Sequence, residues 1–172
     1  MAGKRFKIVD ASGYSAVPTA RFQTDAAAGD IDAGMIVILT ANGSPYVTPL
    51  VTNDQVIGTN TAIIGLAAGS STHTALVDGY VDVYMPLPGI VYEGYADTAS
   101  NIDTQAKLDA YMNDRVQALV SATTIAGDWT IDEDGGEDQT SPFMLVDGDF
   151  ERGTVKFIIR EGATYLGDQD LS

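Results

Sequence analysis

Cysteine is absent from this chain of 172 residues, and histidine occurs only once, as His73. Without cysteine, neither a disulfide nor a thiolate metal site can form. His73 lies in a loop of Ser and Thr residues with no neighbouring carboxylate, so we expect an exposed loop residue rather than a general base. One histidine without cysteine nearly excludes a zinc site as well. The sequence therefore predicts no cofactor and no metal, and its serines lack the setting of a hydrolase nucleophile.

Long hydrophobic runs are also missing. No run reaches the roughly 18 apolar residues that a membrane-spanning helix needs. The first residues, MAGKRFKIVDASGY, include basic side chains but no apolar segment behind them, so they do not resemble a secretory signal. We expect a protein that is made in the cytoplasm and has no membrane partner.

Basic residues are scarce: nine stand against 24 acids, which gives a formal net charge of −15. Such a surface repels nucleic acid and anionic membranes, and its simplest consequence is solubility. The bases are unevenly placed, because Lys4, Arg5 and Lys7 lie within the first seven residues.

An acidic loop of sequence DEDGGEDQTSP occupies residues 132–142. Its candidate oxygen ligands are the carboxylates of Asp132, Asp134, Glu137 and Asp138. Calcium accepts such oxygen ligands, but the spacing of an EF-hand loop is absent. The pattern favours an ordinary solvated loop and leaves calcium binding open.

The central stretch of the chain is ALVDGYVDVYMPLPGIVYEGYA, residues 75–96. Apolar and polar side chains alternate along Gly79–Met85, which is typical of a strand with one buried face. A second β-prone run covers Ile90–Tyr95, and Pro86 and Pro88 separate the two because proline cannot donate to a strand ladder. We interpret the stretch as a hairpin in the middle of a β-rich core.

Further strand candidates recur about every ten residues, separated by Gly, Asn and Pro. They are Met35–Leu39, Pro45–Thr52, Ile63–Ala68, Gly127–Ile131, Phe143–Val146 and Thr154–Arg160. Asn42-Gly43 indicates a tight turn after the first of them. This spacing predicts a mainly β fold, a barrel or a sandwich.

One segment has helical rather than strand periodicity. Between Ser100 and Ala122 there is no Gly or Pro, and apolar residues recur at helical spacing from Leu108 to Val120. Ser100 or Asn101 can cap the segment. The sequence predicts a single late helix over about 100–122.

The first 24 residues contain few apolar anchors, with a short extended candidate at Phe6–Val9. Terminal stretches of this kind are usually held loosely unless they dock on another surface. We therefore expect an N-terminal arm at 1–24 and a single β-rich domain at 25–172.

A resemblance to a known family connects several of these segments. A G-x-I-x-A-G step at 29–34 enters a hydrophobic strand, an IGLA strand follows at 64–67, and a DG-x-V-x-V strand follows at 78–83. This order is similar to that in the decoration (cement) proteins of tailed-bacteriophage heads, and it covers roughly residues 27–95. The resemblance implies a β-barrel or β-tulip protein without enzymatic activity.

It further implies a homotrimer that binds the outside of the assembled capsid and stabilises the virion, with the major capsid protein as partner. Nucleic acid, membranes and small-molecule substrates are not expected as partners. We expect Lys4, Arg5, Phe6, Lys7 and Ile8 of the arm to dock on the capsid, the bases meeting acidic side chains.

Two alternatives from other classes stay open. An acidic protein could mimic DNA, although these carboxylates cluster in turns rather than at phosphate-like spacing. A small trimeric β-fold nucleotide hydrolase is disfavoured, because AAGDI at 27–31 only faintly resembles its first motif and its phosphate-binding bases are absent.

Overall fold

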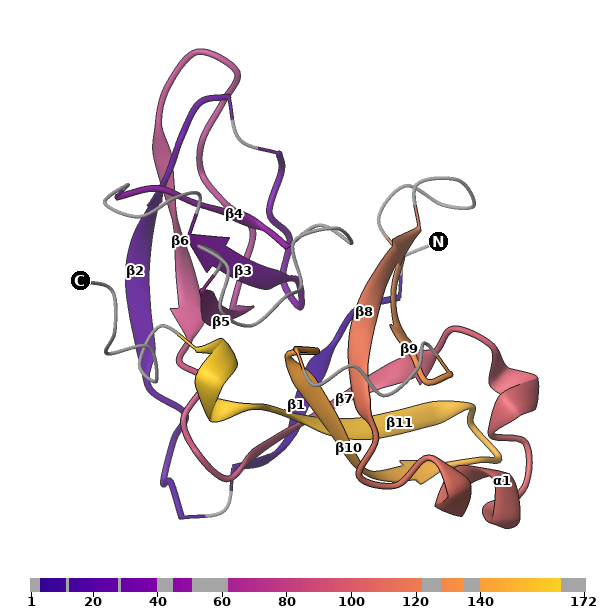
Figure 1. Ribbon diagram of the computed structural model, residues 1–172. Helices are drawn as coiled ribbons and strands as arrows, with labels where there is room; N and C mark the ends of the chain where they lie inside the picture. The colour runs from indigo at the N-terminus through magenta and orange to yellow at the C-terminus, as the bar shows by residue number, and fades with distance from the viewer. Residues whose placement is uncertain are drawn as a thin grey trace.

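The computed structural model describes residues 4–11, 13–27, 29–39, 45–50, 62–121, 128–134 and 140–164 (Figure 1). The protein is mainly β, as the sequence predicts, and its strands form two sheets. The predicted turn at Asn42-Gly43 lies outside the described residues. No helix in the described part of the chain is long and apolar enough to cross a membrane.

The larger sheet closes into a five-stranded barrel. The sheet has six strands in the order β1-β7-β11-β10-β8-β9. Because β7 also pairs with β9 in parallel, the five strands β7, β11, β10, β8 and β9 form the closed ring, and β1 is added beside β7. Their bounds are β1 Lys7–Ala11, β7 Ile90–Ala96, β8 Arg115–Ser121, β9 Asp128–Asp132, β10 Phe143–Asp149 and β11 Thr154–Ile159. β1 pairs with the first half of β7, and β9 pairs with the end of β7. Both strands therefore lie along the same edge of β7.

The second sheet has the order β2-β6-β5-β3-β4. Its strands are β2 Thr19–Thr24, β3 Ile36–Leu39, β4 Val47–Pro49, β5 Ile63–Ala67 and β6 Gly79–Tyr84. An isolated parallel bridge joins Gln23 of the edge strand β2 to Tyr46, the residue before the other edge strand, β4, so this sheet also curls on itself. Figure 1 shows the two sheets as separate lobes, with β1 and β7 passing into the barrel.

The core explains why β3 and β5 are apolar along their whole length. Ile36 and Ile38 of β3 belong to a large buried cluster shared with barrel side chains such as Phe157. Val37, between them, belongs to a smaller cluster inside the five-stranded sheet with Val81 of β6. Both faces of these strands are buried, and strands in that position lack polar alternation.

The predicted hairpin of Gly79–Met85 and Ile90–Tyr95 is wrong. Both strands exist, with Val81 and Val83 buried as expected, but β6 pairs in the five-stranded sheet and β7 in the barrel. The intervening segment crosses between the sheets. Pro86 and Pro88 interrupt strand pairing both in a hairpin and in a segment that crosses to another sheet. The local sequence therefore does not distinguish a hairpin from a crossing.

The predicted helix over 100–122 is much shorter in the structure. The only α-helix among the described residues, α1, spans Gln105–Ala110, with Thr104 as its N-cap and a short 3₁₀ turn, Ala99–Asn101, before it. Asn113, at φ +71°, breaks the helical path. The chain then continues as β8, where Val116 and Ala118 are buried and alternate with more exposed neighbours.

The prediction of a separate arm at 1–24 is wrong for the described residues. β1 pairs with β7 of the barrel, and β2 pairs with β6 over the whole range Thr19–Thr24. Phe6 is 2% exposed and belongs to the large buried cluster. The N-terminal segment is therefore part of both sheets.

Candidate functional site

The three N-terminal bases are engaged within the molecule. The Lys7 ammonium lies 2.6 Å from a Glu93 carboxylate oxygen, and the Arg5 guanidinium lies 3.5 Å from Asp32. The Lys4 ammonium lies over the ring of Tyr95, 5.2 Å from its centroid. These contacts reduce the positive charge offered to a partner, and docking of these bases on a capsid protein stays a prediction.

The two apolar residues of the same segment are less available. Phe6 makes edge-on contacts with Trp129 and Phe157, at centroid distances of 5.9 and 5.2 Å. Ile8 is half-buried and packs against the large core cluster. Phe6 therefore does not offer the pocket contact expected of a free arm.

His73 is not the exposed loop residue that the sequence predicts. Its side chain is 3% exposed, and its Nε2 lies 3.7 Å from a carboxylate oxygen of Asp30. The backbone of His73 lies directly beside Gly79, where an added Cβ would overlap the His73 nitrogen. The tertiary fold thus brings together a carboxylate and a histidine that lie in different loops.

The start of the acidic loop is partly buried rather than wholly solvated. Glu133 is 2% exposed, and its two carboxylate oxygens accept hydrogen bonds from the backbone N–H groups of Asp97 and Thr98, at 3.0 and 3.2 Å. Burial raises the pKa of Glu133 and, together with a hydrogen bond to Asp134, that of Asp132. Glu137 and Asp138 lie outside the described residues, and the described part of the chain contains no group of three or more side chains suited to a metal ion.

The segments that carry the resemblance to decoration proteins lie side by side. The step at 29–34 leads into β3, and the other two segments lie in β5 and β6; these three strands are consecutive in the five-stranded sheet. Gly34 has φ +83° and donates its N–H to Ala67 of β5, while a Cβ there would meet the Phe6 carbonyl oxygen at 2.6 Å. Gly34 of the motif therefore has a structural role, because two backbones meet closely there.

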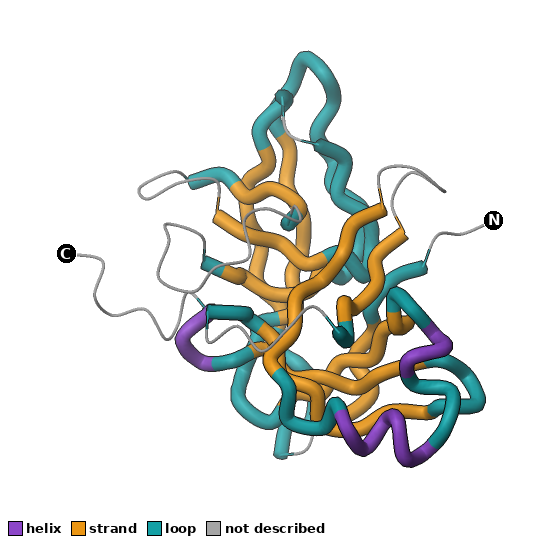
Figure 2. Tube along the Cα trace, turned by 45° about the vertical axis from the view of Figure 1, so that its right-hand side comes forward, coloured by secondary structure: helices purple, strands orange, loops and turns teal. Residues whose placement is uncertain are grey.

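The loop between β5 and β6 exposes two large apolar side chains. Leu76 is 91% exposed and Val77 is 63% exposed. We call these two residues the loop tip. Paired hydrogen bonds between the backbones of Thr74 and Val77 hold it in a turn. Figures 1 and 2 show this loop at the opposite end of the molecule from α1.

Charged and aromatic groups flank the loop tip on β6. Tyr80 is 42% exposed, and the Arg21 guanidinium lies over its ring at 4.2 Å while binding both carboxylate oxygens of Asp82. Asp78 accepts hydrogen bonds from the Ala26 N–H and the Tyr46 hydroxyl, and these bonds hold its pKa below the ordinary value. The loop tip is thus an apolar point on an otherwise polar, ordered surface.

Sequence reasoning missed the loop tip as a candidate contact. The residues ALV at 75–77 directly follow a Ser/Thr-rich loop and precede the Asp-Gly step. This position of apolar residues between two turn signals is the sequence pattern that indicates an exposed apolar loop.

The fold and these contacts define a mainly β protein that joins a closed barrel to a second, curled sheet. Comparison of the chain with models of known families, with curated proteins and with solved structures finds no match. The likeness to decoration proteins rests on the motif residues quoted above.

Proposed function

We propose that this protein is a structural decoration protein, which binds the outer surface of an assembled phage capsid as a homotrimer and stabilises it. The observation that carries the proposal is the adjacency of β3, β5 and β6, since one motif segment leads into β3 and the other two lie in β5 and β6. Their spacing along the chain therefore corresponds to a structural unit. The protein would be made in the host cytoplasm and reside on the virion exterior, with the major capsid protein as its partner.

We propose the loop tip as a contact with the capsid. Exposed apolar side chains that project from an ordered surface are typical of sites that bind another protein. Burying one large aliphatic side chain is worth about 1.5–3 kcal/mol, so the loop tip of one chain binds only weakly. Three tips on one trimer multiply this affinity through effective concentration.

The acidic side chains do not favour the DNA-mimic alternative. Asp32, Asp82 and Glu93 form ion pairs with bases of the same chain, and Glu133 accepts backbone hydrogen bonds. A mimic needs a continuous row of carboxylates that face outward. Among the described residues, no contact or cluster of side chains specifically favours a nucleotide hydrolase.

The test compares two variants in binding to heads purified without this protein. In the first, Leu76→Ser and Val77→Ser are combined; in the control, Val146→Ser changes an apolar residue of β10 that is 36% exposed. We expect both to keep the melting temperature of the parent protein, because the side chains lie at the surface. The loop-tip variant should need at least about tenfold more protein to saturate heads, since it loses more than about 1.4 kcal/mol of contact energy.

Two outcomes would contradict these ideas separately. If the loop-tip variant saturates heads at the same concentration as the control, the tip is not the contact. If antibodies and electron microscopy find no trace of this chain on particles from its source, the decoration function itself is wrong.

A further inference from the structure

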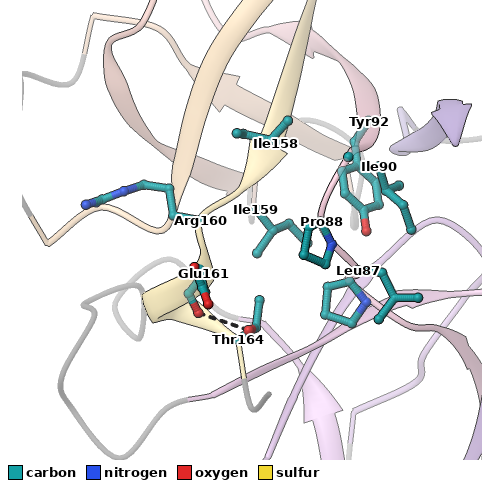
Figure 3. Close-up of a pocket in the computed structure, with 11 residues that line it drawn as sticks. Leu87, Pro88, Ile90, Tyr92, Ile158, Ile159, Arg160, Glu161 and Thr164 are labelled. Atoms are coloured by element: carbon teal, nitrogen blue, oxygen red, sulfur yellow. Dashed lines mark hydrogen bonds between the residues drawn. The ribbon is translucent and has the colours of Figure 1, made fainter. Parts of the chain in front are cut away.

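A pocket of about 390 Å³ lies where the chain crosses from the five-stranded sheet to the barrel (Figure 3). One wall is the crossing segment, residues 86–90, and the other is the end of β11 with the following 3₁₀ turn, Glu161–Ala163. A parallel bridge between Thr164, at the rim, and Ile63 of β5 connects this second wall to the five-stranded sheet. The pocket thus lies at the junction of both sheets.

The lining is largely apolar, but it contains one buried hydroxyl that lacks a partner. Tyr92 of β7 is 1% exposed, and its hydroxyl finds no hydrogen-bond partner among the described residues. Its ring stacks on Phe157 at a centroid distance of 5.7 Å, which holds the side chain in place. Figure 3 shows the hydroxyl directed toward Leu87 and Pro88, two residues of the pocket lining.

The buried Tyr92 hydroxyl would be stabilised by a hydrogen bond to a bound molecule. Buried polar groups in folded proteins are nearly always hydrogen-bonded, because leaving one unpaired costs free energy. Burial also raises the pKa of Tyr92, so the hydroxyl stays protonated and acts as a donor. A bound group with an acceptor atom would satisfy it.

The charges around the pocket restrict what can enter. The Arg160 guanidinium points away from the pocket in Figure 3 and donates a hydrogen bond to the carbonyl oxygen of Ser141, at 2.6 Å. The exposed carboxylate of Glu161 lies at the rim, in a protein of net charge −15, and repels anions. A cation would lose its hydration against apolar walls formed by Leu87, Pro88 and Ile159.

We propose that this pocket binds a small uncharged ligand, an apolar molecule whose single acceptor atom takes a hydrogen bond from the Tyr92 hydroxyl. Pockets of about 300–1,000 Å³ with apolar walls and few polar groups are typical of small-molecule sites. The proposal concerns a molecule that is bound and not converted. Because the walls are the segment that crosses between the sheets and the end of β11, a bound ligand also stabilises the contact between these two segments.

Cyclohexanone serves as the probe, since it is uncharged and apolar and carries one carbonyl acceptor. Titration into the isotope-labelled, full 172-residue chain should shift the backbone amide NMR signals of Leu87, Gly89 and Ile159 and raise the melting temperature. Cyclohexanecarboxylate, which has the same ring with a negative charge, should bind more weakly.

Tyr92→Phe tests the hydroxyl directly. This variant should fold at least as stably as the parent, because the hydroxyl loses no partner, while its affinity for cyclohexanone falls about 2- to 12-fold. Tyr95→Phe changes a tyrosine of the same strand that does not line the pocket, and it should bind the probe as the parent does.

The proposal is overturned if cyclohexanone shifts no pocket signal up to its solubility limit. It is also overturned if Tyr92→Phe binds the probe as tightly as the parent, or if the carboxylate binds better than the ketone.

Discussion

Gly65 is a position at which an added side chain would directly disturb this fold. Gly65 has φ +147°, and a Cβ there would overlap the carbonyl oxygen of Tyr84 in the neighbouring strand. It is part of the IGLA motif, in the middle of β5. The close approach of β5 and β6 therefore depends on the absence of a side chain at this residue.

We predict that Gly65→Ala destabilises the protein by more than about 3 kcal/mol or prevents folding. The substitution adds backbone strain of about 1–3 kcal/mol and a steric overlap that buried strands cannot relieve cheaply. Gly69→Ala is the matched control, because a Cβ there meets nothing within 4 Å. Urea unfolding of the two variants would measure the difference, and equal midpoints would show that the strands can separate without cost.

Two carboxylates of this protein, Asp132 and Asp82, have pKa values shifted in opposite directions, with opposite effects on stability. Burial and the neighbouring Asp134 raise the pKa of Asp132, whereas the hydrogen bond from Arg21 lowers that of Asp82. A raised pKa means that the native state holds the proton more tightly than the unfolded chain. The free energy of unfolding then falls as the pH rises through the interval from the ordinary value of 3.8 to the native one.

Asp132→Asn should therefore increase the free energy of unfolding at pH 7, by less than about 1 kcal/mol because solvent screens a half-exposed group. The gain should shrink as the pH falls toward 4, where Asp132 of the parent also becomes protonated. Asp82→Asn should do the opposite, losing stability at pH 7 and approaching the parent as the pH falls. Urea unfolding at pH 7, 5.5 and 4 would test both signs; a stabilising effect of Asp82→Asn at pH 7 would refute the assignment.

At the scale of elements, β7 connects more of the barrel than any other described strand. It pairs with β1 and β9 along one edge and with β11 along the other. The segment before β1 continues this arrangement, since the Lys4 carbonyl accepts a hydrogen bond from Trp129 of β9 and Phe6 packs inside. The N-terminal segment thus helps to hold the barrel closed.

Phe6→Ala should lower the free energy of unfolding by about 3–5 kcal/mol, the usual cost of removing a fully buried aromatic ring. Deletion of residues 2–13, which removes β1, should lower the melting temperature strongly, whereas a free arm would leave it unchanged. Val9→Ala is the control within the same strand, because Val9 is 39% exposed and should cost far less. Calorimetry would record the three melting temperatures, and a deletion variant as stable as the parent would contradict the role of β1.

At the scale of the whole molecule, the excess of acids works against assembly. A chain of net charge −15 repels its own copies, and three of them repel one another more strongly still. The proposed trimer must offset this repulsion by burying surface, and salt weakens the repulsion because the Debye length falls to about 8 Å at physiological ionic strength.

We predict that light scattering gives a mass three times the 18.1 kDa of one chain, and that raising the salt concentration favours this species over the monomer. Scattering at several protein concentrations, in low and physiological salt, would separate self-association from nonspecific aggregation. A monomer both in solution and on capsids would contradict the homotrimer.

The sequence by itself determined the local features of this protein. Alternating side chains in β6 placed Val81 and Val83 inside, because neighbouring residues of a strand point to opposite faces wherever the strand pairs. The number of strand candidates and the spacing of turns predicted a mainly β fold for the same reason. These conclusions need no knowledge of distant residues.

Only the tertiary structure decided which strands pair and which segments become strands at all. Residues 115–121 fit a helical stripe and a strand about equally well, and pairing with β9 and β10 selects the strand. Likewise, β7 does not pair with β6. It joins the barrel, where its partners β1, β9 and β11 come from both ends of the chain. The pocket at Tyr92 and the contact of His73 with Asp30 also combine distant segments. Such contacts depend on the packing energy of the whole fold, which no local pattern of side chains records.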